Sequence, residues 1–150
     1  MKVYHLIWVV LVLSSISCKK DKREVDEPIK KEKTISIADT LSLELNAVDK
    51  WLVNSETHEG VNKMDSIISQ FEARGIMSYK ELGEALSKQT SYIIKNCTMT
   101  GKPHDQLHVV LVPMLDEISI LRETDSETES AHALINLTEL IEAYYQYFKL

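Results

Sequence analysis

The sequence predicts an all-α protein: an antiparallel four-helix bundle preceded by a signal peptide, a charged tether and a short extended segment. Two observations predict the bundle. From residue 54 onward, apolar residues recur at spacings of three and four, as along one face of a helix. Short connections separate four such stretches, which favours antiparallel neighbours. The whole chain holds only four glycines, which disfavours elaborate sheet or dinucleotide-binding folds.

The first 17 residues have the layout of a secretion signal. Lys2 supplies a positive start, residues 3–13 are almost wholly apolar, and small residues precede Cys18. As a helix the apolar run would span roughly 16 Å, whereas a bilayer core is roughly 30 Å thick. We therefore expect residues 1–17 to be removed and Cys18 to be lipidated, with acyl chains such as palmitate anchoring the protein to a membrane. The alternative is an ordinary signal peptide with an incidental cysteine.

Residues 18–40 are expected to comprise the lipidated cysteine and a flexible tether, because residues 19–33 are densely charged and offer little to bury. The bundle domain is expected at 41–150, beginning with an extended segment in which leucines alternate with polar residues. Without residues 1–17 the chain has 16 Lys and Arg against 23 Asp and Glu. This acidic balance argues against nucleic acid as a partner.

The first two helices have clear ends in the sequence. Asn54 or Ser55 can cap the first helix, and Gly75 marks its end. Ser78 followed by Glu81 is a capping-box pattern, so the second helix begins after Ser78. The apolar face of the first helix is Val61, Met64, Ile68 and Phe71, and that of the second is Tyr79, Leu82, Leu86, Ile93 and Cys97.

The third and fourth helices follow. Pro103 suits the first turn of the third helix, while Pro113 inside it should produce a kink. The fourth begins around Ser126, with acidic residues near its positive N-terminus. The predicted faces are His104, Leu107, His108, Leu111, Leu115, Ile118 and Leu121 on the third helix, and Leu134, Leu137, Ile141, Tyr144 and Phe148 on the fourth.

One cluster carries chemical character. The second helix ends at Cys97 and the third starts at Pro103, so Cys97, Met99, His104 and His108 should meet at one end of the bundle. The two histidines are spaced i and i+4 and are expected to border the apolar stripe, facing one point. Thiolate and thioether are soft donors suited to Cu(I), whereas thiolate and imidazole also suit Zn(II), which ranks second.

Several neighbouring residues could support this metal site. The Asp105 carboxylate could accept a hydrogen bond from a ligating histidine and so support it, and His58 could reach the same end of the bundle. Tyr144, Tyr145 and Tyr147 fall there too; we expect them to plug the core, with a pocket wall as the alternative. The methionines Met64, Met77 and Met114 are expected to fill the core. Haem is not expected, because the chain has no C-x-x-C-H motif.

The competing interpretation is structural. Cysteine packs as a small hydrophobic residue, and His104 and His108 could be a first-turn residue and a satisfied core histidine. If Cys18 is lipidated, Cys97 is the only free thiol, which excludes an intramolecular disulfide. A reactive Cys97–His104 pair is the enzymatic alternative, but we expect no enzyme because a full nucleophile–base–orienter set is missing.

Two segments resemble a group of small, largely uncharacterised bacterial helical lipoproteins. The more specific one is Cys97-Thr98-Met99-x-Gly101-x-x-His104-Asp105-x-Leu107-His108; the other includes Leu45-Asn46, Lys50-Trp51, Asn54-x-Glu56-Thr57 and Gly60-Val61. The resemblance covers about residues 41–150 and departs at Val109, where the group often has Trp. It implies a helical bundle in the cell envelope, and it implies no established activity. From the lipoprotein signal we expect this bundle to face the periplasm or to be exposed at the surface of the outer membrane. A scaffold whose 34–53 segment docks a protein partner is the remaining alternative.

Overall fold

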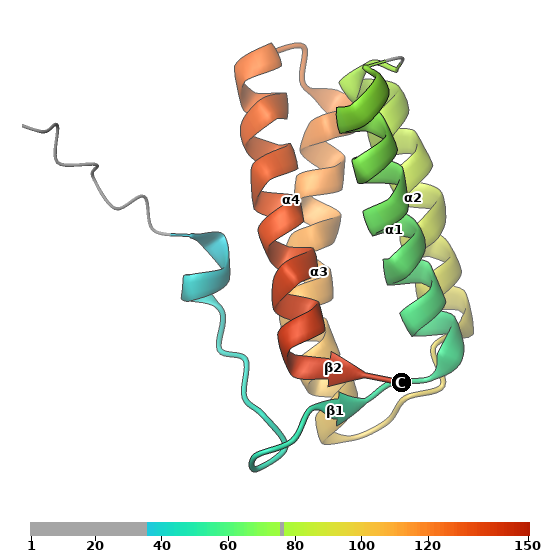
Figure 1. Cartoon of the computed structure of the whole chain (residues 1–150), viewed down its shortest axis with the longest axis vertical. Coiled ribbons are helices and arrows are strands. Elements are labelled where there is room, and N and C mark those ends of the chain that lie inside the picture. The colour runs from blue at the N-terminus through green and yellow to red at the C-terminus, as the bar shows by residue number, and fades with distance from the viewer. Residues whose placement is uncertain (1–35, 76) are drawn as a thin grey trace, which may run out of the picture. The chain divides into compact units, whose positions relative to one another are not determined.

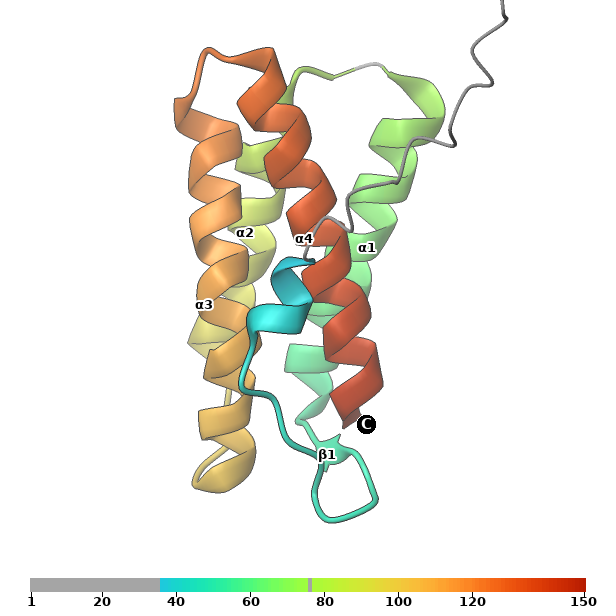
Figure 2. The same ribbon diagram turned by 90° about the vertical axis from the view of Figure 1, so that its left-hand side faces the viewer.

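The computed structural model describes residues 36–75 and 77–150. Four helices dominate it and form the expected all-α bundle (Figure 1): α1 (Ser55–Arg74), α2 (Tyr79–Asn96), α3 (Lys102–Glu123) and α4 (Glu127–Tyr147). Consecutive helices run antiparallel and pack side by side (Figure 2). The signal peptide, Cys18 and most of the tether lie outside the described residues. Among those described, no helix has both the length and the apolarity that crossing a bilayer requires.

The predicted helix ends are confirmed because their caps are local. Asn54 occupies the N-cap position of α1, although its side chain makes no capping bond to the helix backbone, and Gly75 ends that helix with a left-handed φ of 57°. Ser78 and Glu81 form both hydrogen bonds of the capping box at the start of α2. Ser126 caps α4, its side chain accepting from the backbone N–H of Glu129.

Short elements complete the domain beside α4 and at its C-terminal end. The 3-10 helix η1 (Ile37–Thr40) precedes an extended stretch, and β1 (Trp51–Leu52) pairs in parallel with β2 (Phe148–Lys149). This pairing holds the entry to α1 beside the end of α4. Ser36 donates its hydroxyl to Glu139 Oε2 at 2.7 Å, and the backbone N–H of Ile37 donates to the same atom at 3.2 Å. Ordered contacts with α4 therefore begin before residue 41, within the segment expected to be tether.

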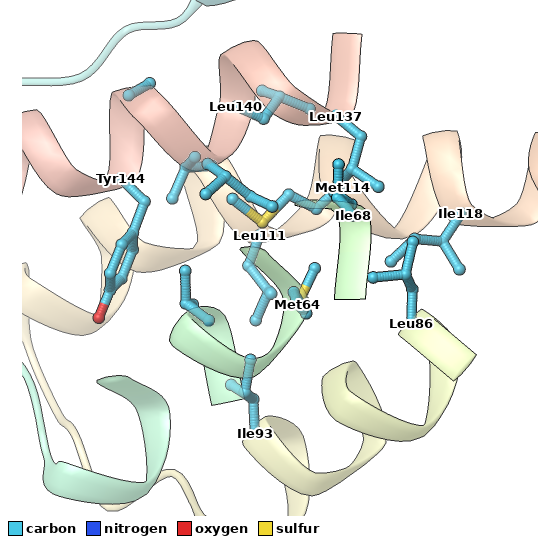
Figure 3. Close-up of a cluster of buried hydrophobic side chains, with 14 of the residues drawn as sticks. Met64, Ile68, Leu86, Ile93, Leu111, Met114, Ile118, Leu137, Leu140 and Tyr144 are labelled. Atoms are coloured by element: carbon cyan, nitrogen blue, oxygen red, sulfur yellow. The ribbon is translucent and has the colours of Figure 1, made fainter. Parts of the chain in front are cut away.

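The core runs along the bundle axis (Figure 3). The expected packing role of Met64 and Met114 is confirmed, since both are fully buried, and Met77 packs against the core from its edge. α3 continues unbroken through Pro113. All five residues of the predicted α4 face are buried: Leu134, Leu137, Ile141, Tyr144 and Phe148.

Candidate functional site

His104 and His108 form a close pair on successive turns of α3. Their ring centroids lie 4.3 Å apart, with an interplanar angle of 55°. His104 is half-buried, whereas His108 is exposed. The expectation that His108 borders the apolar stripe and avoids solvent is therefore wrong. Leu107 and Leu111 take the core positions of these turns, so the imidazole of His108, about 100° further round from Leu107, faces outward.

Cys97 and Met99 lie on the connection between α2 and α3. Cys97 is the C-cap of α2, and its backbone N–H donates to the Ile93 carbonyl at 2.8 Å. Both side chains are half-buried and pack against the hydrophobic core. Within residues 36–75 and 77–150, no three His, Cys, Asp or Glu side chains are placed to hold one metal ion. The sequence spacing thus brings the four residues to one end of the bundle, but only the two imidazoles form a close pair.

Asp105 and His58 do not support the pair as expected. The Asp105 side chain is exposed, and the hydrogen bonds of the described residues include none from it to an imidazole. His58 on α1 instead lies with its Nδ1 3.2 Å from the hydroxyl oxygen of Tyr144. The ligands available at this end are therefore the imidazole pair and the two sulfur atoms of the connection.

The tyrosines close the core at this end, as expected. Tyr144 is fully buried and stacks on Phe148 with centroids 5.2 Å apart. Burial raises the pKa of Tyr144 well above its ordinary value; burial and the nearby Asp65 raise that of Tyr145 to about 12. Both hydroxyls therefore stay protonated at neutral pH, and that of Tyr145 donates to Asn62 Oδ1 at 2.7 Å. None of the three tyrosines lines the open hollow of about 450 Å³ beside His58.

A polar network, missed by sequence reasoning, joins the start of α1 to the end of α2. Asn54 donates its amide to the Asn96 carbonyl at 3.1 Å and to Glu56 Oε2 at 2.8 Å. Its Oδ1 accepts the hydroxyl proton of Thr57 at 2.6 Å, and Thr57 is completely buried. Asn54 therefore fixes the connection that begins at Cys97. The sequence feature that could have indicated this network is a polar residue three positions before a threonine on the buried face of α1.

The segment before α1 braces the start of α3. Trp51 donates its indole N–H to the Glu44 carbonyl at 2.6 Å, and the Glu44 N–H donates to Gln106 Oε1 at 2.7 Å. Lys102 Nζ lies 3.4 Å from Glu44 Oε2 and 5.6 Å from the centre of the Trp51 ring. The turn that carries His104 is thus held from a second side.

Comparison with known proteins adds no assignment: no protein-family model, no curated protein and no solved structure matches this chain. The candidate ligands of the site are a close imidazole pair on a braced helix and two soft sulfur donors on the adjoining connection.

Proposed function

We propose that the protein is a lipid-anchored protein of the cell envelope whose bundle binds a soft transition metal, Cu(I), at the α2–α3 end. The observation that carries this proposal is the pair His104 and His108, whose ring centroids lie 4.3 Å apart. Imidazoles on successive helical turns can direct nitrogen donors at one ion. The exposure of His108 leaves the pair open to an incoming metal.

The sulfur atoms of Cys97 and Met99 would complete the site and select the metal. Thiolate and thioether prefer Cu(I) to hard ions such as Mg²⁺ or Ca²⁺. Residues 97–100 belong to no helix or strand, so these two side chains can turn toward the imidazoles without unwinding either helix. A metal on Cys97 would also shield a thiol that is exposed to oxidants after export. The proposed role is binding, without catalytic turnover.

The test is thermal unfolding of the reduced full chain with Cu(I), with Zn(II) and without metal. Binding stabilises a fold by about 2.7 kcal/mol at a hundredfold excess of metal over Kd. We expect Cu(I) to raise Tm in wild type and in the control His132→Ala, whose histidine is exposed on α4. The rise should be lost in His104→Ala/His108→Ala and reduced in Cys97→Ser/Met99→Leu. Equal shifts in all four proteins, or no shift with either metal, would refute the site.

A non-enzymatic structural or interaction lipoprotein is the second candidate. Two observations favour it: Cys97 and Met99 pack against the core, and two large apolar side chains are exposed, Val48 at 94% in the turn before β1 and Leu52 at 63% in β1 itself. Deleting residues 34–53 would also remove Trp51 and Glu44 from the fold, so a Val48→Asp/Leu52→Asp variant is the sharper probe. This candidate prevails if that variant abolishes the cellular role while Cys97→Ser changes neither phenotype nor metal content.

A further inference from the structure

Glu117 on α3 is a buried carboxyl group with incomplete hydrogen bonding. It is 7% exposed. Its Oε1 accepts from the Asn136 amide on α4 at 3.1 Å, while its Oε2 has no hydrogen-bond partner among the described residues. Neither of the two ion pairs found in 36–75 and 77–150 involves Glu117.

In neither protonation state does the surrounding protein provide Glu117 with all the partners that its charge and hydrogen-bonding atoms require. As a carboxylate it has a buried charge with no cation and an acceptor with no donor, which is costly. As a carboxylic acid it has a hydroxyl donor with no acceptor. A bound cation with N–H donors would compensate the charge of the carboxylate.

Glu117 also lines a cavity between α3 and α4. The cavity has a volume of about 230 Å³ and is lined by Glu117, Ile120, Glu129, His132, Ala133 and Asn136. Its polar lining is rich in acceptors, since two carboxylates and an imidazole contribute to it. The Asn136 amide already donates to Glu117. Ile120 and Ala133 supply an apolar wall.

The size and lining select the class of ligand. The cavity, about 230 Å³ in volume and open to solvent, has room for a small organic molecule. A buried carboxylate without a cation is matched by a positively charged group that carries N–H donors, which favours an N–H cation. We propose that this cavity binds a small organic cation, a primary ammonium or guanidinium with a short alkyl chain.

In this arrangement the cationic head donates to Glu117, and the alkyl chain lies against Ile120 and Ala133. The site is separate from the proposed copper site. Both lie on α3, but nine positions separate His108 from Glu117, about 14 Å along the helix axis. Glu117 belongs to the second half of α3 (Lys102–Glu123), the half that leads into α4.

The test is calorimetric titration of the full chain in detergent with propylammonium and propylguanidinium at constant ionic strength, and with neutral propionamide. We expect saturable binding of at least one cation, and at least tenfold weaker binding of propionamide. Glu117→Gln should weaken cation binding at least tenfold. The matched control Glu127→Gln removes a charge from an exposed position of α4 outside the cavity and should bind like wild type.

A second variant keeps the proposal testable if Glu117→Gln does not fold. Ile120→Trp fills the cavity from a residue that is 39% exposed, and it leaves the carboxyl group in place. It should abolish cation binding. The proposal is overturned if neither cation binds wild type saturably, if propionamide binds equally well, or if the folded variants retain wild-type affinity.

Discussion

Glu117 makes stability depend on pH in the opposite sense from the surface carboxylates. Burial, followed by the negative charge of Asp116, raises the pKa of Glu117 above 4.5, whereas its hydrogen bond from Asn136 lowers it. The folded state therefore holds this proton more tightly than the unfolded chain. Its contribution to stability is present below the unfolded pKa and is lost as pH rises through the folded pKa.

Glu117→Gln should reveal this effect, because glutamine keeps the shape and does not ionise. Without added cation, we expect the variant to have a higher Tm than wild type at about pH 7, and the difference to shrink toward about pH 4. Asp49, Glu56 and Glu81 have lowered pKa values through hydrogen bonds, so their stabilisation is lost in acid. Both proteins carry these groups, so the difference in Tm isolates Glu117. A pH-independent difference would contradict the interpretation.

At the level of single side chains, the sequence predicted which residues gather at one end better than where each points. The face of α3 was located, yet His108 lies just outside it, because the buried line passes through Leu107, Val110 and Leu111. The apolar pattern of a helix locates its buried face only to within about one residue position. The contact between His58 and Tyr144 depends on how α1 meets α4, which no local pattern encodes.

Elements were predictable where their signals are local. The capping box at Ser78 and the left-handed Gly75 are read within a few residues, so the limits of α1 and α2 were correct. η1 and the β1–β2 pair depend on partners about a hundred positions away: Ser36 on Glu139, and Trp51 on Phe148. Their pairing was therefore missed, although an extended segment was expected in that region.

The close approach of α1 and α2 at Gly60 gives a prediction at the scale of elements. A Cβ at Gly60 would overlap Ile93 Cγ1 and lie 2.8 Å from its Cδ1, and Ile93 is fully buried. Overpacking costs about 1–3 kcal/mol, whereas alanine gains at most ~1 kcal/mol of helix propensity over glycine. We expect Gly60→Ala to destabilise the bundle by up to about 2 kcal/mol, measured by denaturant unfolding.

Two controls separate packing from helix propensity in that experiment. Ser69→Ala changes an exposed position of the same helix and should leave stability within about 0.5 kcal/mol of wild type. Ile93→Ala removes the atoms that the new methyl group would meet. The double variant should therefore be more stable than the sum of the two single effects predicts. Strict additivity would show that Gly60 is not a packing contact.

At the scale of the whole molecule, membrane anchoring and folding should be separable. Among the residues that the structure describes, the buried core is built from positions 51–148, and contacts with α4 extend to Ser36. The lipid predicted on Cys18 would provide membrane affinity of roughly 0.8 kcal/mol per buried CH₂, but it would add nothing to this core. Anchoring and stability should thus respond to different substitutions.

Cys18→Ala tests this separation. We expect the variant to lose labelling by radioactive palmitate and to leave the pool of lipid-anchored envelope protein, because the acylated thiol is the only anchor that the sequence predicts. Its purified domain should unfold at the wild-type Tm, since no residue of the core has changed. Gly60→Ala provides the reverse control, with a lower Tm and normal labelling. Equal labelling of wild type and Cys18→Ala would show that Cys18 is not the lipidation site, and a lowered Tm would show that the N-terminal segment contributes to the fold.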